Sequence, residues 1–231
     1  MDVEKEIRSL KNKTEYHIED LLRIMEILRS EQGCPWDRAQ GHKDLRKNLI
    51  EEAYEVADAI DREDPASLRE ELGDLLLQIV FHAQMEKEKG VFDFDGVAND
   101  ISLKMIRRHP HIFGEQKITD AAGSYDAWEQ IKREEKGARP LSEEMDGVAK
   151  TLPSLVRAEK LLKKAAKAGA YTPDSVAQVY LSQPLDEAKS AMLADLRSLC
   201  AAAALLDIDL EEALYFENEA LIEKVKEKEN G

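Results

Sequence analysis

Two pairs of acidic side chains have a spacing that suits chemistry in this 231-residue sequence. Glu52 and Glu55 form the first pair, and Glu71 and Asp74 form the second. Residues three apart lie on the same face of an α-helix, so each pair would project from one helix. If these two helices pack antiparallel across the break at 61–65, all four carboxylates can converge. Four converging negative charges repel one another unless a cation lies among them.

Apolar residues surround both acidic pairs and predict that the two helices pack against each other. Because these stripes adjoin the acids, we expect Glu52 and Asp74 to face the seam between the helices. Oxygen ligands at a partly buried seam suit Mg²⁺, with Mn²⁺ as a substitute. The alternative is a solvated acidic face, which is common in a chain with 35% charged residues. The apolar stripes are Leu49, Ile50, Ala53, Val56, Ala59 and Ile60 on the first helix, and Leu72, Leu75, Leu76, Ile79, Val80 and Ala83 on the second.

Helix start and stop signals place the two acidic helices. The first is expected from about 43–45 to Arg62, and Asp64 followed by Pro65 predicts an N-cap and the first position of the second helix. The second helix should end near Gly90, since glycine is favoured just past a helix C-terminus. Further helices are expected at 18–30, at about 95–108 and after Ser124 as a cap. Every long segment fits a helical period and none alternates like a strand, so the predicted fold class is all-α.

Cationic and aromatic residues follow the acids along the chain. Lys104 and Arg108 lie one turn apart on one predicted helix, and Trp128 and Lys132 lie one turn apart on the next. Such groups suit the phosphates and base of a nucleotide, although solvated surface charges are the alternative. Gly33 and Pro35 interrupt the helical pattern and are expected to hold Trp36 in a loop. Trp36 is either a lid over a ligand or, as we favour, a plug in the core.

Composition limits the classes of ligand and compartment. The net charge of −15 argues against sequence-independent binding of polymeric nucleic acid, so an anionic ligand must meet a local basic cluster or a metal. Cys34 and Cys200 are far apart and form no dense framework, which favours a reducing cytosol, although a disulfide between them stays open. The beginning of the chain is charged and no apolar stretch reaches the ~20 residues of a membrane span. We expect a cytoplasmic protein without membrane contact.

Several motifs together resemble the MazG nucleoside triphosphate pyrophosphohydrolases over about residues 18–136. They are the Gly-Cys-Pro-Trp-Asp segment at 33–37, the two acidic pairs, the run at 107–114 and Trp128 with Lys132. The resemblance implies an all-α MazG-like helical bundle, Mg²⁺ dependence, frequent homodimers, and hydrolysis of NTPs or dNTPs to a monophosphate and pyrophosphate. It divides the chain into a lead-in at 1–17, a catalytic domain at 18–136 and a helical region at 137–231.

The same resemblance assigns roles to individual residues. Glu51 or Glu55 is the candidate for polarising the attacking water, and Trp36 or Trp128 could stack on the base. The implied metal ligands are Glu52, Glu55, Glu71 and Asp74; the implied nucleotide contacts are Lys104, Arg108, Trp128 and Lys132; and Asn48 and Glu51 lie close to the site.

The region 137–231 is interpreted as a shortened second repeat that has lost its ligands. When its helical pattern is overlaid on the first repeat, Asp195 matches Asp74, but Met192 replaces Glu71. No EExxE motif precedes this pair, so a role in packing or in supporting a dimer is expected. An unrelated helical tail is the alternative.

Two other functions compete with nucleotide hydrolysis. Helical bundles with inward carboxylates also hold di-iron centres, but these centres use Glu-x-x-His pairs, whereas both pairs here are purely acidic. A non-enzymatic helical interaction or regulatory module is the second alternative, favoured by the altered C-terminal half. Release of pyrophosphate from nucleotides would distinguish the enzyme from both.

Overall fold

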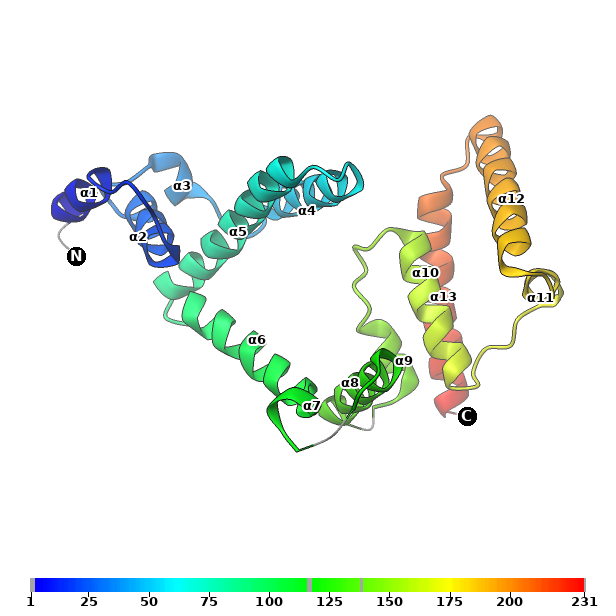
Figure 1. Cartoon of the computed structure of the whole chain (residues 1–231). Helices are drawn as coiled ribbons and strands as arrows, with labels where there is room; N and C mark the ends of the chain where they lie inside the picture. Colours follow the sequence, from blue (N-terminus) through cyan, green and yellow to red (C-terminus); the bar gives the residue numbers. More distant parts are fainter. Residues whose placement is uncertain (1–2, 116–117, 138, 231) are drawn as a thin grey trace. The chain divides into compact units, whose positions relative to one another are not determined.

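The computed structural model describes residues 3–115, 118–137 and 139–230, and within these ranges it contains helices and no strand. The expectation of an all-α fold is confirmed. Figure 1 shows the order of the elements along the chain. They are α1 (Val3–Lys11), α2 (Ile18–Arg29), α3 (Pro35–Ala39), α4 (Arg46–Asp61), α5 (Pro65–Glu88), α6 (Phe94–Arg108), α7 (Pro110–Phe113), α8 (Ala121–Lys136), α9 (Leu141–Asp146), α10 (Ser154–Lys167), α11 (Ser175–Leu181), α12 (Leu185–Leu206) and α13 (Leu210–Asn230).

The chain divides into two compact units, Met1–Trp128 and Glu129–Gly231. The division falls inside α8, so the two ends of this helix belong to different units. No helix in the described ranges is long and apolar enough to cross a membrane.

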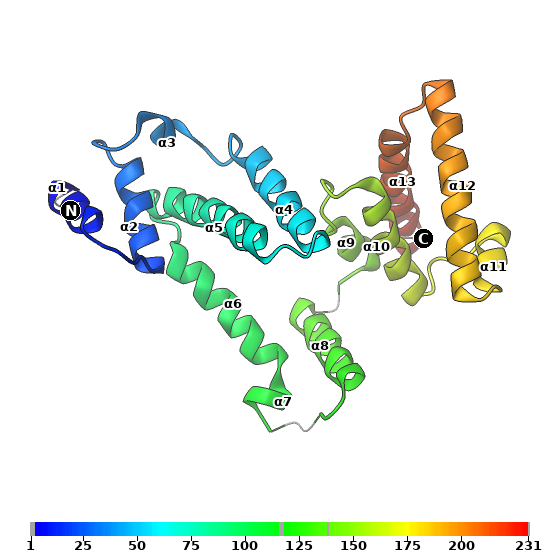
Figure 2. The same ribbon diagram turned by 45° about the horizontal axis from the view of Figure 1, so that its top comes forward.

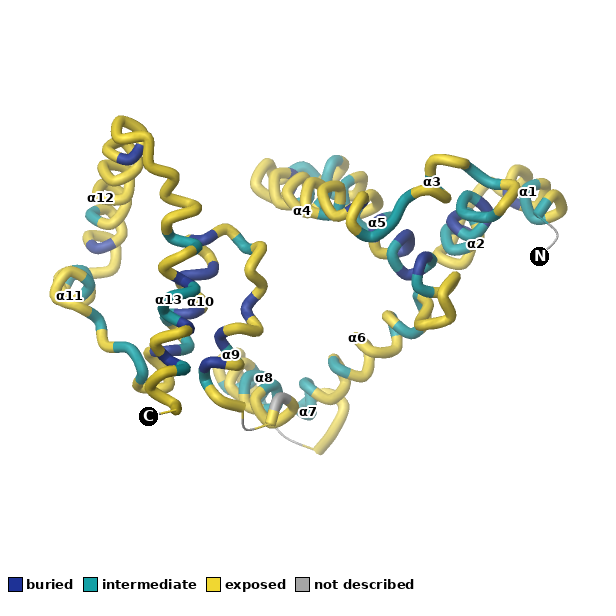
Figure 3. The backbone as a smooth tube through the Cα atoms, turned by 180° about the vertical axis from the view of Figure 1, so that it is seen from behind, coloured by how far each residue is buried: buried dark blue, intermediate teal, exposed yellow. Residues whose placement is uncertain are grey.

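The first unit has a small core that joins α2 to the C-terminal half of α5. Its buried side chains include Met25 from α2 and Val80, Phe81 and Met85 from α5. Arg29 covers this core, because its guanidinium lies 5.2 Å from the Phe81 ring and pairs with a carboxylate at the end of α5. In Figure 3 the dark blue, buried stretches of this unit gather where α2 meets α5, whereas α4 is mainly yellow and teal. The N-terminal half of α5, which carries two of the acids, therefore lies outside this core.

A helical hairpin of α4 and α5 brings the acidic helices together. Asp64 caps α5, since its side chain accepts hydrogen bonds from the backbone N–H groups of Ala66 at 3.0 Å and Ser67 at 3.3 Å, and Pro65 occupies the first turn. This prediction is confirmed. Glu63, in the connecting turn, has a positive φ of 52°, which reverses the chain direction. The two helices lie side by side in both views (Figures 1 and 2).

Two local expectations were wrong. The segment after Gly33 forms the short helix α3, because Pro35 supplies a favourable first helical residue rather than only interrupting the pattern. The helix α8 begins at Ala121, before Ser124, and Asp120 accepts a hydrogen bond from Gly123 N–H at 2.8 Å. Asp and Ser are both good N-cap residues, so the earlier of the two begins the helix.

The second unit is built on α9, α10 and α13. Its core includes Met145, Leu161 and Ile222, one from each of these helices. Arg157 is fully buried, and its guanidinium lies 2.6 Å from the carboxylate of Glu219 on α13. Helices α10 and α13 lie side by side (Figures 1 and 2), whereas α12 contacts α11 and is largely exposed (Figure 3).

Candidate functional site

Three carboxylates meet on the α4–α5 hairpin. Glu52 and Glu55 from α4 and Glu71 from α5 each offer an oxygen within 4.8 Å of the other two. Glu52 and Glu71 are half-buried and Glu55 is exposed. We call these three residues the acidic cluster. It is a group of oxygen ligands with the geometry to share one divalent cation.

The acidic cluster is electrostatically strained. Burial, and next the charge of Asp74, raise the pKa of the Glu52 carboxyl. Burial, and next the charge of Glu55, likewise raise the pKa of Glu71. Both shifts have the sign that mutual repulsion of like charges in a partly desolvated site produces. A bound cation would reverse this repulsion, so the donor set fits a metal such as Mg²⁺.

Asp74 differs from its expected position. Its side chain is exposed rather than facing the seam, and it lies outside the three-residue group. It is nevertheless near enough for its charge to raise the pKa values of Glu52 and Glu71. Asp74 is thus placed at the rim of the cluster.

The other residues predicted near the acids lie on the exposed side of α4. Asn48 lies one turn before Glu52 on the same helix, and Glu51 directly precedes Glu52 in the sequence. Both side chains are exposed. They are therefore accessible to a ligand that approaches the acidic cluster from solvent.

The structure brings two predicted nucleotide contacts together on α6 and α8. The guanidinium of Arg108 lies 5.3 Å from the centre of the Trp128 ring, a cation–π contact between residues 20 positions apart. The Tyr125 ring stacks with the Trp128 ring, and the two ring centres are 6.4 Å apart. Lys104 is half-buried one turn before Arg108. Cations and an aromatic face are combined here as a triphosphate and a base would require.

Lys132 and Trp36 lie in different settings. Lys132 is one turn after Trp128 on α8 and pairs with Glu129 at 2.9 Å. Trp36 is 60% exposed, so the favoured interpretation as a core plug was wrong. Its place in the short helix α3, with Pro35 at the first position, holds it at the surface instead.

A histidine pair was missed by sequence reasoning. Nδ1 of His82 on α5 lies 2.7 Å from Nδ1 of His42. His42 Nε2 in turn lies 2.5 Å from Glu86, which also accepts a hydrogen bond from Lys89 at 2.6 Å. The spacing of His82 and Glu86 on α5 and of its C-cap Lys89 indicates one helix face, but nothing in the local sequence pairs that face with His42.

A protein-family model for the "MazG nucleotide pyrophosphohydrolase domain" matches residues 40–113, which contain the acidic cluster and α6. A Thermotoga maritima protein named "Nucleoside triphosphate pyrophosphohydrolase/pyrophosphatase MazG" is 38% identical over 223 residues, covering 91% of this chain and 85% of that protein. The chain belongs to the MazG family.

Other MazG relatives match a shorter part. The "Nucleoside triphosphate pyrophosphohydrolase" of Escherichia coli K12 is 46% identical over 153 residues, covering 66% of this chain. The chain spans 58% of the length of that relative. A solved MazG-related protein from Thermotoga maritima is 31% identical, and the match covers 50% of this chain and 98% of that one with a TM-score of 0.43.

Both Cys34 and Cys200 are free thiols. The structure therefore contains no disulfide between them.

Proposed function

We propose that this protein hydrolyses nucleoside triphosphates, NTPs or dNTPs, to a nucleoside monophosphate and pyrophosphate. The observation that carries the proposal is the convergence of Glu52, Glu55 and Glu71 on the hairpin of a MazG-family domain. The names of the Escherichia coli and Thermotoga maritima relatives support the same reaction. The exposed rim of the cluster leaves it open to a substrate.

Glu52, Glu55, Glu71 and Asp74 would hold Mg²⁺, with Mn²⁺ as a substitute. A bound divalent ion would neutralise phosphate oxygens and offset the charge that develops on the leaving pyrophosphate. Carboxylate oxygens without a histidine fit this hard cation better than an iron centre, which supports hydrolysis over oxygen chemistry.

Side chains of the protein would bind the triphosphate, accept a proton and stack on the base. Lys104 and Arg108 would bind the triphosphate, and their fixed positive charge would stabilise it most when its own charge shifts to the leaving group. Glu51 or Glu55 would accept the proton of the attacking water. Trp128, fixed by Arg108, offers a face on which any base can stack.

We further propose that the active form is a homodimer. Helix α4 packs chiefly against α5 in the described part of the chain, and the pair leaves several large apolar side chains exposed. An isolated two-helix hairpin buries too little apolar surface, and a second copy would complete a four-helix arrangement. The exposed residues are Ile50, Tyr54, Ile60, Leu72 and Ile79.

The reaction is tested by incubating the full chain with each NTP and dNTP and with MgCl₂, followed by separation of the products. We expect equal amounts of monophosphate and pyrophosphate. Release of orthophosphate and a diphosphate would contradict the proposal, and no turnover with any nucleotide would favour the non-enzymatic module. Oxidised nucleotides in the same panel test a role in removing damaged nucleotides from the cellular pool. The compartment proposed for this role is the reducing cytoplasm.

A further inference from the structure

The second unit contains a cleft lined mainly by lysine and arginine, which we call the basic cleft. It lies between the C-terminal part of α8, α9 and α10 and has a volume of 790 Å³. Of its fifteen lining residues seven are Lys or Arg and two are Glu. The seven cations and two acids give the lining a formal charge of +5 (7 − 2), in a chain whose net charge is −15. The cleft therefore has an electrostatic character opposite to that of the molecule as a whole.

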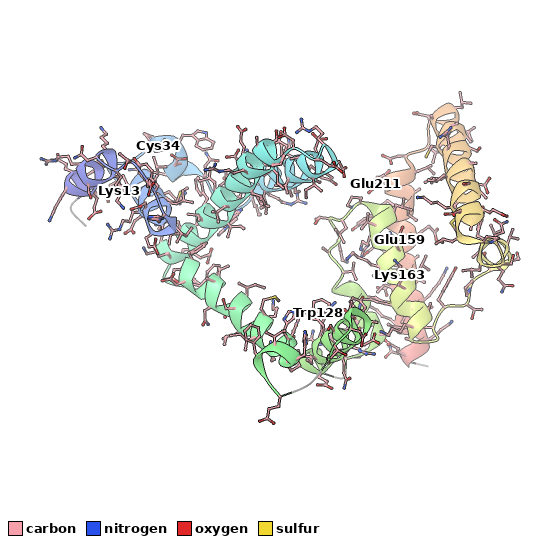
Figure 4. All side chains as sticks on the ribbon, in the orientation of Figure 1. Lys13, Cys34, Trp128, Glu159, Lys163 and Glu211 are labelled. Carbon is pink, nitrogen blue, oxygen red and sulfur yellow. The ribbon has the colours of Figure 1, made fainter. Side chains whose placement is uncertain are left out.

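One face of α10 supplies four of these cations. Lys160, Lys163, Lys164 and Lys167 have the i, i+3, i+4, i+7 spacing of a single helix stripe, beside the stripe that packs Leu161 into the core. Lys163 is labelled on this helix in Figure 4. The helix dipole stabilises lysines in the last turn, but Lys160 and Lys163 precede that turn. Like charges one turn apart destabilise a helix. The stripe is thus arranged at some cost to the helix.

The two acids of the cleft are already paired with cations. Glu144 lies 3.1 Å from Lys164, and Glu129 lies 2.9 Å from Lys132, which holds the pKa of the Glu129 carboxyl below its usual range. Lys163 lies 3.7 Å from Glu159, and Arg139 lies 3.4 Å from Glu143; both acids are outside the lining. Among the described residues, Lys160 and Lys167 have no carboxylate at ion-pair distance. A surplus of positive charge consequently remains after all pairs in the cleft are formed.

The remaining lining residues narrow the class of ligand. Leu141, Val148 and Leu152 line the cleft beside the cations, and such low-dielectric walls strengthen the field at its centre. None of the described residues that line the cleft is aromatic, so the cleft is suited to phosphates rather than to stacking on a base. Its volume is that of a small-molecule site. A compact anion of high charge fits these features better than a nucleic-acid polymer.

We propose that the basic cleft binds a small anion with two or more linked phosphates, either free pyrophosphate or the triphosphate tail of a nucleotide. Its α10 lysines are separate from every residue assigned to hydrolysis. Lys132 lines the cleft and is also a proposed nucleotide contact, so it stays unchanged in the test below.

The test is calorimetric titration of the full chain with inorganic pyrophosphate, at ~50 mM salt so that screening is limited, and with a chelator so that no metal-bridged binding occurs. Wild-type protein should bind pyrophosphate. The variant Lys160→Gln/Lys163→Gln/Lys167→Gln should bind at least ~10-fold more weakly, since charge-assisted hydrogen bonds are lost. Repeating the titration with tripolyphosphate and with a non-hydrolysable NTP shows whether the nucleoside contributes to binding. Equal affinity for these two ligands indicates that the cleft recognises the phosphate chain alone.

Matched controls separate this site from general charge and from the hydrolytic site. Lys189→Gln/Lys224→Gln/Lys228→Gln removes the same charge from exposed positions outside the cleft and should keep wild-type affinity. Glu52→Gln should bind as wild type does, whether or not the proposed hydrolysis is correct. Replacement of the three cleft lysines by arginine should retain binding and guards against a loss caused by misfolding. Absence of pyrophosphate binding to the wild type, or equal weakening by both glutamine triples, would overturn the proposal.

Discussion

At the scale of single residues, Glu52 has the features of a group kept for function rather than for stability. Its carboxyl is half-buried and its pKa is raised by burial and by the neighbouring acids. Since a raised pKa means that folding disfavours the charged form, ionised Glu52 destabilises the metal-free protein at neutral pH. This strain has a purpose only if a cation is bound there.

The first prediction uses this contrast. Glu52→Gln should lower pyrophosphate release at least ~100-fold, because even changes outside a metal's direct ligands cost 10–100-fold. The metal-free variant should melt at the same temperature as the wild type or higher, since one repelling charge is removed. Rates from pyrophosphate detection and melting curves from circular dichroism check both parts. Asp61→Asn, an exposed carboxylate on the same helix, should change neither, and unaltered turnover in Glu52→Gln would disprove the metal-site assignment.

A second prediction concerns His82. Burial, and then the charge of His42, lower its pKa, so the folded protein binds fewer protons at this site than the unfolded chain does. The associated stability is present above the unfolded pKa of ~6.5 and is lost as pH falls below it. Urea denaturation between pH 8 and pH 5 should show this loss, and the slope should be smaller in His82→Gln, which cannot titrate. The contacts of His42 with Glu86 and Lys89 remain in that variant, and equal slopes would show that His82 is not responsible.

At the scale of elements, α5 connects the acidic cluster to the core. Its first half carries Glu71 and Asp74 beside α4, and its second half carries Phe81 and Met85 in the core with α2. Packing of the second half of α5 in the core therefore holds the first half, with Glu71 and Asp74, in a fixed position relative to the rest of the first unit. The beginning of α5 is the point at which a local change should affect the site.

The third prediction addresses the N-cap of α5. Asp64→Ala should destabilise the protein by about 1 kcal/mol, the usual cost of losing a cap. The hydrogen bonds from the Ser67 side chain, Ser67 N–H and Ala66 N–H lower the pKa of Asp64, so its stabilising effect is present above the unfolded value of ~3.9 and fades as pH falls below it. Urea titrations at pH 7 and pH 3.5 measure this difference. Asp64→Asn, which still accepts backbone hydrogen bonds, should recover most of the loss, and an equal loss in both variants would argue against capping.

Caps and helical periods predicted the elements well because they depend on neighbours in sequence. Asp64 and Pro65 identified the start of α5 for this reason. Ser124 was misjudged because Asp120 is an equally good cap four residues earlier. The exposure of Trp36 depends on what packs beside α3, which local sequence does not contain.

The same distinction holds for the site. The i, i+3 spacing, the short break and the apolar stripes together predicted that four carboxylates converge, and Glu52, Glu55 and Glu71 do so. These patterns did not predict that Asp74 stays at the rim, nor that Arg108 lies over Trp128, because these depend on how two helices approach each other.

At the scale of the whole molecule, the two units divide the chemistry. Among the described residues, the one group of three acids with metal-ligand spacing lies in the first unit. In the second unit Asp195 pairs with Tyr180 instead. That residues 137–231 are a shortened repeat that has lost its metal ligands stays a prediction, with an unrelated helical tail as its alternative.

The last prediction tests assembly. The α4–α5 hairpin exposes 55% of Ile60 and 39% of Ile79, and burial of such side chains in a second copy would stabilise a dimer at roughly 25 cal/mol per Å². Ile60→Glu/Ile79→Glu should therefore convert a dimer into a monomer in light scattering coupled to gel filtration, because carboxylates cannot be buried there without a partner. Val91→Glu/Ile112→Glu, at two positions that are each 66% exposed outside the hairpin, is the matched control and should remain dimeric. A monomeric wild type, or dissociation of the control variant alone, would show that this face does not join two copies of the chain. The α4–α5 hairpin would then have to be stable without a second copy packed against it.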